Sequence, residues 1–351
     1  MSSNLFPPVP PEPLIARLRP RSVPELLDQA FRVYRRHFLT FLAIIAIVHV
    51  PLQLLIQAAN IMMLGDYTNW LKALEQGSTG ERASSAAFPI LGLWYIVVLA
   101  LSLVYWLLQS LSQGALTAAI ANSYMDRPVS FGQAYSSMLK RIGPLLGAIG
   151  LQVLIGIAIF SPFIILLLLS MASMLASATT GTGGGSSGSY EAASIGLMCI
   201  AFLLIVPLGV LAIYVFVRLS VIVPALMVEG AGPVQALKRS WALINNSWWR
   251  TVGLLVLLGL LNYVISEGPA YFITGIIGLF MRWLDPLTLS AVTAGVQVFT
   301  SLIYIPVELS AVTLYYFDLR VRKEGFDLEA AIDRQFGPLL TPAVQAQWQS
   351  Q

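Results

Sequence analysis

Long runs without a charged residue constrain this chain more than any other feature. Six apolar runs lack charge, and a helix rising about 1.5 Å per residue needs about 20 residues to cross a bilayer. Only 11% of the 351 residues are charged, against about 25% in ordinary globular domains. We therefore expect an all-α polytopic membrane protein with six transmembrane helices. The runs are Phe38–Met63, Phe88–Met125, Ile142–Ala176, Ala192–Val217, Thr251–Ser266 and Pro286–Val307.

The fifth run is slightly short for a full crossing. The apolar residues 271–281 follow Glu267-Gly-Pro, and two interpretations of them stay open. They either continue the fifth span or form a re-entrant segment.

The placement of Lys and Arg predicts the orientation, because basic loops stay on the cytoplasmic side. With a cytoplasmic N-terminus, all 20 basic residues lie inside except Lys72, Arg82 and Arg282. We therefore predict that both termini are cytoplasmic.

A short amphipathic helix is predicted before each odd-numbered span. From Ser22 to Phe38 the apolar residues recur at i, i+3, i+4 and i+7, and Ser22 with Glu25 forms a capping box. The same stripe and cap spacing recur from residue 130 and from residue 232. The sequence thus predicts three pseudo-repeats, each an interfacial amphipathic helix plus a transmembrane hairpin. They cover about residues 22–125, 130–228 and 232–318.

The repeats form one six-span membrane domain over residues 18–329. Before it, residues 1–17 are rich in proline and are expected to be a disordered N-terminal tail. After it, residues 330–351 are expected to be a short cytoplasmic tail.

Basic residues on the amphipathic helices are candidate contacts for lipid headgroups. Each basic charge near an anionic bilayer surface contributes roughly 1 kcal/mol of attraction. The alternative is that these helices only pack around the bundle. Nucleic acid is excluded as a partner, because the basic residues lie beside the membrane entry points. The candidate headgroup contacts are Arg32, Arg35, Arg36, Lys140, Arg141, Lys238 and Arg239.

Two ionisable residues are candidates for a polar site inside the membrane, where charges are costly and usually functional. Arg218 and Glu308 lie at similar distances from the charged ends of their spans, and we expect them to pair across the fourth and sixth spans. The alternative is that both spans leave the membrane early. Polar residues in the first three spans are expected to form interhelical hydrogen bonds or to line a polar cavity. They are Gln53, Gln57, Asn60, Gln109, Gln113 and Gln152.

Three segments carry a family resemblance: LRPRSVPELLDQAFRVYRRHFLTFL, VPALMVEGAGPVQALKRSWALINNSWWR and TLYYFDLRVRKEGFDLE. They resemble the glycerophosphoryl diester phosphodiesterase membrane-domain family, a six-span bacterial module. The resemblance covers Leu18 to Glu329 and implies the bacterial plasma (inner) membrane. It also implies that catalysis belongs to a separate soluble domain.

Catalytic groups are not expected in this chain. It has two histidines, His37 and His49, with no carboxylate cluster beside either, and His49 is expected to be a hydrogen-bonded core residue. The single cysteine, Cys199, excludes an intramolecular disulfide and is expected to be buried. We therefore expect no enzyme, no metal and no cofactor.

Two functions follow from these patterns. The first is a non-catalytic integral membrane module that binds membrane lipids, including anionic phospholipid, or a partner membrane or envelope protein at the cytoplasmic face. The second is a transporter or lipid-translocating protein with a site between the repeats near Arg218 and Glu308. A polar cavity between the repeats would favour the second function, and a dry, closed bundle would oppose it.

Overall fold

The computed structural model describes residues 20–75, 80–125, 127–180, 187–280 and 286–325, and every regular element in these ranges is helical. The fold is therefore all-α, as predicted, and the predicted tails lie outside the described residues. The elements are α2 (Val23–Arg36), α3 (Phe38–Glu75), α4 (Gly80–Tyr124), α5 (Phe131–Leu139), α6 (Ile142–Thr180), α7 (Ser187–Leu219), α8 (Ile222–Glu229), α9 (Pro233–Ile244), α10 (Trp248–Asn262), the π-helical turn η1 (Tyr263–Glu267), α11 (Gly268–Phe280) and α12 (Pro286–Glu324).

Five helical stretches of the described residues are long and apolar enough to cross a membrane. They are Phe38–Asp66, Ile142–Ser173, Ala192–Glu229, Trp248–Phe280 and Leu287–Glu324. The predicted second span lies in α4, where the side chains of residues 80–96 fall outside the described part of the chain. A sixth span therefore stays a prediction.

The fifth candidate span continues through residues 271–280 without a break in the helix. The turn η1 joins α10 to α11, so these residues extend the fifth helix and do not form a re-entrant segment. A π-turn displaces the regular backbone hydrogen bonds. Here the Thr300 hydroxyl lies within hydrogen-bonding distance, 3.2 Å, of the Ser266 carbonyl. A Cβ at Gly268 would lie 2.9 Å from the Tyr263 carbonyl oxygen, so this turn requires glycine.

The three predicted amphipathic helices are present as α2, α5 and α9. In α2 the Ser22 N–H donates to the Glu25 carboxylate at 2.8 Å. In α5 the Ser130 hydroxyl accepts from the Gln133 N–H at 3.3 Å. Gln235 accepts from the backbone N–H three residues before it at the start of α9. The cap spacing in the sequence therefore locates the start of each helix correctly.

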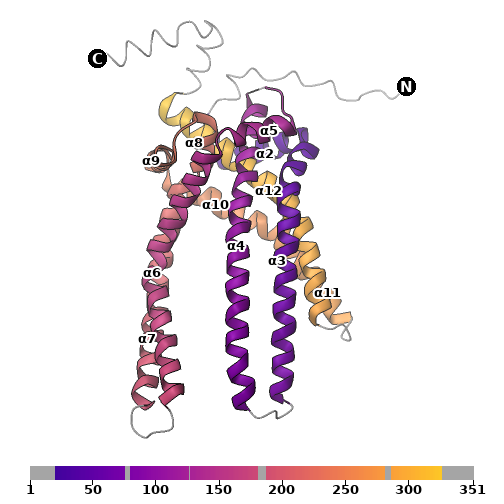
Figure 1. Cartoon of the computed structure of the whole chain (residues 1–351). Helices are drawn as coiled ribbons and strands as arrows, with labels where there is room; N and C mark the ends of the chain where they lie inside the picture. Colours follow the sequence, from indigo (N-terminus) through magenta and orange to yellow (C-terminus); the bar gives the residue numbers. More distant parts are fainter. Residues whose placement is uncertain (1–19, 76–79, 126, 181–186, 281–285, 326–351) are drawn as a thin grey trace, which may run out of the picture.

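The short helices α2, α5, α8 and α9 gather at one end of the molecule, which we call the short-helix end (Figure 1). From this end α3 and α4 run side by side, and α6 and α7 form a second long hairpin. The last helix, α12, packs against α2, α3 and α11 and finishes at the short-helix end.

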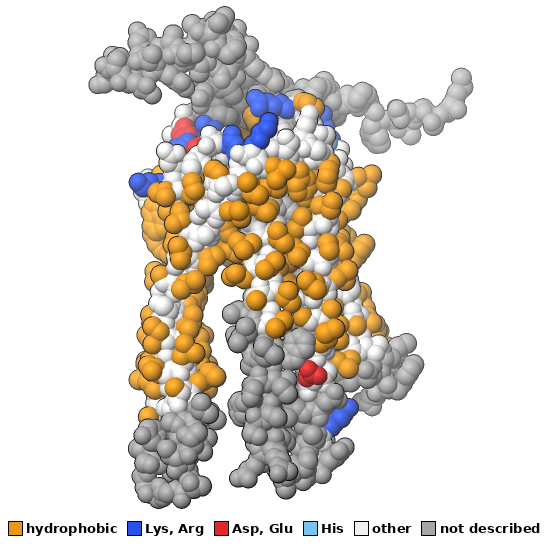
Figure 2. Space-filling view, in the orientation of Figure 1, with side chains coloured by type: hydrophobic (Ala, Val, Ile, Leu, Met, Phe, Trp, Pro, Cys, Tyr) orange, Lys and Arg blue, Asp and Glu red, His pale blue; other side chains and the backbone are white. Residues whose placement is uncertain are grey.

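The best-packed core also lies at the short-helix end. One buried cluster joins α2, α10 and α12 through residues that include Leu26, Leu254 and Tyr315. A second joins α3, α4 and α6 through residues that include Phe41 and Leu116. Apolar side chains cover the flanks of the long helices, and blue basic side chains gather mainly at the short-helix end (Figure 2). The apolar flanks suit a lipid environment, and the basic end suits a membrane surface.

Candidate functional site

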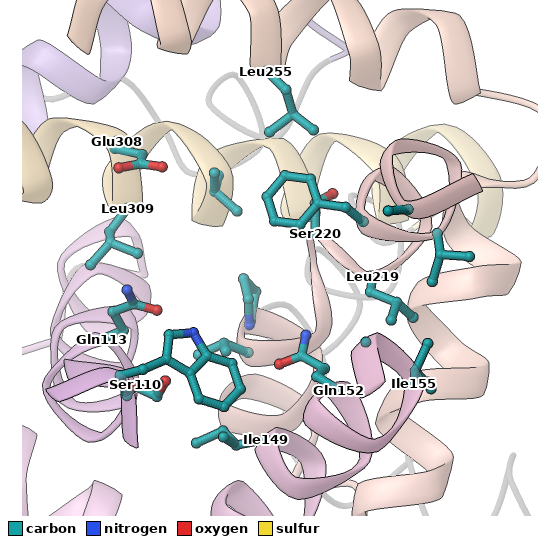
Figure 3. A pocket seen from close by; sticks show the side chains of 18 of the residues that line it. Ser110, Gln113, Ile149, Gln152, Ile155, Leu219, Ser220, Leu255, Glu308 and Leu309 are labelled. Carbon is teal, nitrogen blue, oxygen red and sulfur yellow. Dashed lines mark hydrogen bonds between the residues drawn. The ribbon is translucent and has the colours of Figure 1, made fainter. Parts of the chain in front are cut away.

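A cavity of about 420 Å³ lies between the hairpin α6/α7 and the helices α4, α8, α10 and α12 (Figure 3). Its lining residues are Trp106, Ser110, Gln113, Thr117, Ile149, Gln152, Ile155, Gly156, Ile159, Phe160, Ala212, Val215, Phe216, Leu219, Ser220, Val223, Pro224, Leu255, Glu308, Leu309, Val312 and Thr313.

Helical periodicity explains why α4 presents a polar strip to this cavity. Ser110, Gln113 and Thr117 are spaced i, i+3 and i+7, which places them on one face of the helix. Across the cavity, Gln152 on α6 points inward, toward the same space as Gln113 (Figure 3). The remaining walls are mostly apolar. The cavity therefore has polar side chains on one part of its wall and apolar side chains on the rest.

Among the described residues that line the cavity, Glu308 of α12 is the single ionisable one. Its carboxylate has no hydrogen bond or ion pair with any residue that the structure describes. A carboxylate placed among membrane-spanning helices without a partner is costly. Its position therefore favours a role in binding over a role in packing.

Two hydroxyl groups at the cavity wall also lack partners. Thr117 is 1% exposed and Thr313 is 0% exposed, and neither Oγ1 has a hydrogen-bond partner among the described residues. Leaving a buried hydroxyl unsatisfied costs about 1–3 kcal/mol. Both residues belong to the cavity lining, but their hydroxyl oxygens are buried behind its surface and do not face the open space.

Arg218 does not form the predicted ion pair with Glu308 among the described residues. Its guanidinium donates to Asn245 Oδ1 at 3.0 Å and to the Tyr214 hydroxyl at 2.9 Å. It also stacks 5.0 Å from the centre of the Trp241 ring. The prediction placed Arg218 by counting residues from the charged end of its span along one continuous helix. In the structure α7 ends one residue after Arg218 and the chain turns into α8, so the guanidinium faces α9.

Two of the seven candidate headgroup contacts are already bound within the protein. Arg239 forms ion pairs with Glu229 at 2.9 Å and with Glu324 at 2.5 Å. Burial lowers the pKa of Arg239, but hydrogen bonds to these carboxylates outweigh burial and raise it overall. Arg141 donates to the Leu226 carbonyl at 2.9 Å, near the end of α8. These two residues therefore act mainly in joining the short helices.

The other five candidates are exposed at the short-helix end. They are Arg32, Arg35, Arg36, Lys140 and Lys238. They lie on α2 and α9 or just after α5, and Arg36 also has a contact within the chain. Their exposure is compatible with the predicted headgroup contacts.

His49 is a buried, hydrogen-bonded residue, as predicted. Its Nε2 lies 2.8 Å from the Ser301 hydroxyl, and its Nδ1 lies 3.1 Å from the Tyr105 hydroxyl. Ser301 already donates to the Val298 carbonyl, so we assign the proton of the neutral ring to Nε2 and the Tyr105 proton to the bond with Nδ1. The contacts join α3, α4 and α12.

The described residues contain no group of three His, Cys, Asp or Glu side chains able to hold a metal ion. Cys199 is exposed on α7, contrary to the expectation that it is buried. It was taken for a core residue because it lies in an apolar run. On this hairpin most apolar residues face outward, as a lipid-facing helix requires.

The sequence identified Glu308, Gln113 and Gln152 but missed Thr117, Thr313, Ser110 and Ser220. The spacing of Ser110 and Thr117 around Gln113 was the available signal on α4. Thr313 gave no comparable signal, because its position depends on how α12 packs against the other helices. Comparison of the chain with protein-family models gave no match, and neither did comparison with curated proteins or with solved structures.

Proposed function

We propose that this chain is a non-catalytic, multi-pass membrane protein that binds a lipid-like amphiphile in the cavity between the hairpin α6/α7 and α12. The observation that carries the proposal is the cavity itself, whose unpartnered polar groups face apolar walls. An amphiphile has the same division into a polar head and apolar chains. The proposal unites lipid binding with the site near Glu308 that the sequence predicted.

Access from the side supports a ligand that arrives through the bilayer. Phe216 and Trp106 both line the cavity, and they are 67% and 37% exposed. Their exposure at an apolar surface indicates that the cavity opens toward the lipid. Such an opening suits both storage and translocation of a lipid.

The topology belongs to the same proposal. We place six spans, three pseudo-repeats and two cytoplasmic termini in a bacterial inner membrane, within the glycerophosphoryl diester phosphodiesterase membrane-domain family. The quoted sequence segments, the three short capped helices and the bias of Lys and Arg support this assignment. The exposed basic residues of the short-helix end would then contact anionic phospholipid headgroups, or a partner membrane or envelope protein.

Native mass spectrometry of gently extracted protein tests the binding proposal. Gly156 lines the cavity, and a Cβ there meets no atom within 4 Å, so Gly156→Phe would place a ring in the open space. Gly150 lies on the same helix with equally free Cβ space but does not line the cavity, so Gly150→Phe is the matched control. We expect retained phospholipid to decrease in Gly156→Phe alone. Equal retention in both variants would refute the cavity as the site.

Labelling with a membrane-impermeant maleimide tests the topology. Single cysteines at Ser22, Ser130 and Thr288 are introduced in a Cys199→Ser background. We expect the first two positions to react only from the cytoplasmic side and Thr288 only from the outer side. Labelling of Ser22 and Ser130 from opposite sides would refute the repeat.

A further inference from the structure

We propose that the cavity selects an amphiphile whose polar head carries a primary ammonium group, with a lipid as its source. This inference rests on the proposed function, because it names the class of ligand that the same cavity binds. It differs from the sequence-based expectation of anionic phospholipid, which concerned the surface of the short-helix end.

The charge of the lining carries the first step. Glu308 contributes the carboxylate of the lining, and the described lining residues include no lysine, arginine or histidine. The nearby Arg218 side chain does not line it, because its guanidinium is held by Asn245 and Tyr214. An anionic head without an ammonium group would therefore meet an uncompensated carboxylate, whereas the ammonium group of a zwitterionic head would neutralise it.

The hydrogen-bonding groups carry the second step. An ammonium group has three donors and no acceptor, so it needs several oxygen atoms around it. Glu308 offers a carboxylate at the cavity wall. The Gln113 and Gln152 side chains face the same space and have no hydrogen bond to a described residue. Together these groups can satisfy an ammonium head.

The apolar part of the lining carries the third step, since it distinguishes a lipid from a free amine. Ile155, Ile159 and Leu309 supply apolar walls beside the polar groups. Phe216 at the exposed rim gives the chains of a lipid a path to the bilayer. A small water-soluble amine would leave these walls uncovered.

The test is a competition measured by native mass spectrometry on the full chain in mixed nanodiscs. The nanodiscs contain equal amounts of phosphatidylethanolamine and phosphatidylglycerol with identical acyl chains. We expect the lipid that the wild-type protein retains above the level of Gly156→Phe to be mainly phosphatidylethanolamine. Glu308→Gln should reduce that preference about tenfold, as expected for the loss of one hydrogen bond to a charged group.

Glu267→Gln is the matched control, because this carboxylate binds Gln297 at 2.9 Å and does not line the cavity. It should keep the wild-type preference. If Glu308→Gln does not fold, the Gln113→Leu variant provides the second test, and it should weaken the same preference. A preference for phosphatidylglycerol above the level of Gly156→Phe, or an unchanged preference in the folded Glu308 and Gln113 variants, would overturn the inference.

Two further outcomes separate this inference from the proposed function. Lipid retained without headgroup preference, but lost in Gly156→Phe, would refute the ammonium head and leave the proposed function intact. No lipid retained above the level of Gly156→Phe would refute the proposed function itself. Free ethanolamine at millimolar concentration should not displace the lipid, and complete displacement would overturn a lipid as the source.

Discussion

The Arg250 guanidinium and the Asp318 carboxylate form an ion pair, with 2.7 Å between Nη1 and Oδ2. Asp318 is 4% exposed, and it also accepts the backbone N–H of Arg21 at 2.7 Å and Nε of Arg322 at 3.0 Å. One buried carboxylate therefore joins α12 to the start of α10 and to the segment that precedes α2. These three parts of the chain lie far apart in the sequence.

Asp318→Asn should lower the free energy of unfolding by about 2 kcal/mol. The amide keeps the shape but leaves two guanidinium groups without their counter-charge. The loss is smaller than for a fully buried pair, because Arg250 and Arg322 are partly exposed. Thermal unfolding in detergent, followed by circular dichroism, measures it. Asp28→Asn, at an exposed position of α2, is the control and should change stability by less than about 0.5 kcal/mol. Equal losses in both variants would contradict the role of Asp318.

Arg239→Ala should lower stability, whereas Lys238→Ala should lower lipid retention, although the two residues are adjacent. Arg239 bridges Glu229 and Glu324, so its removal leaves two carboxylates close together and should cost about 1 kcal/mol of stability. Lys238 is exposed, so its removal should reduce retained phosphatidylglycerol with little loss of stability. Native mass spectrometry and thermal unfolding separate these effects. The prediction fails if Arg239→Ala loses lipid and keeps its stability.

Gly147→Ala should destabilise the contact between α6 and α9. A Cβ at Gly147 would lie 2.7 Å from Cγ and 3.3 Å from Cβ of Pro233, whose ring cannot rotate away. Crowding of this kind costs about 1–3 kcal/mol. Gly150→Ala, where a Cβ meets nothing within 4 Å, should be neutral or slightly stabilising. The measurement is the thermal unfolding midpoint of each variant in the same detergent. Equal midpoints would contradict the close packing of Gly147 against Pro233.

Tyr105→Phe should have only a small effect, because it removes one hydrogen bond between helices. Such bonds contribute about 0.6 kcal/mol on average within membranes. The variant leaves His49 bound to Ser301. Tyr263→Phe, at a position that is 60% exposed, serves as the comparison and should be neutral. A loss above about 3 kcal/mol in Tyr105→Phe would show that the contact does more than join α3 to α4.

Features set by local sequence were predicted well. The caps at Ser22 and Ser130 located two short helices, because capping depends on residues only three positions apart. The apolar runs predicted long helices for the same reason. The apolar runs do not show which of their residues face the bundle and which face outward. Cys199 was therefore predicted to be buried, although it is exposed.

Features set by tertiary packing could not be predicted in the same way. The predicted pair of Arg218 and Glu308 was wrong, because the turn after Leu219 gives no strong sequence signal. Arg239 was taken for a lipid contact because its two carboxylate partners come from α8 and α12. Glu308 was identified because a charge within an apolar run is visible from sequence alone. Its neighbours Thr117 and Thr313 became part of the site only when α4 and α12 were placed together.

The hairpin α6/α7 gives the cavity a wall that is anchored at one end. Beyond the cavity, between Phe160 and Ser173 on α6 and between Ala192 and Leu211 on α7, Ser170 and Ala201 are the only buried residues that the structure describes. The outer part of this wall is therefore positioned by the surrounding lipid more than by the rest of the protein. A thicker or thinner bilayer would change the tilt of such a hairpin at little cost in protein contacts.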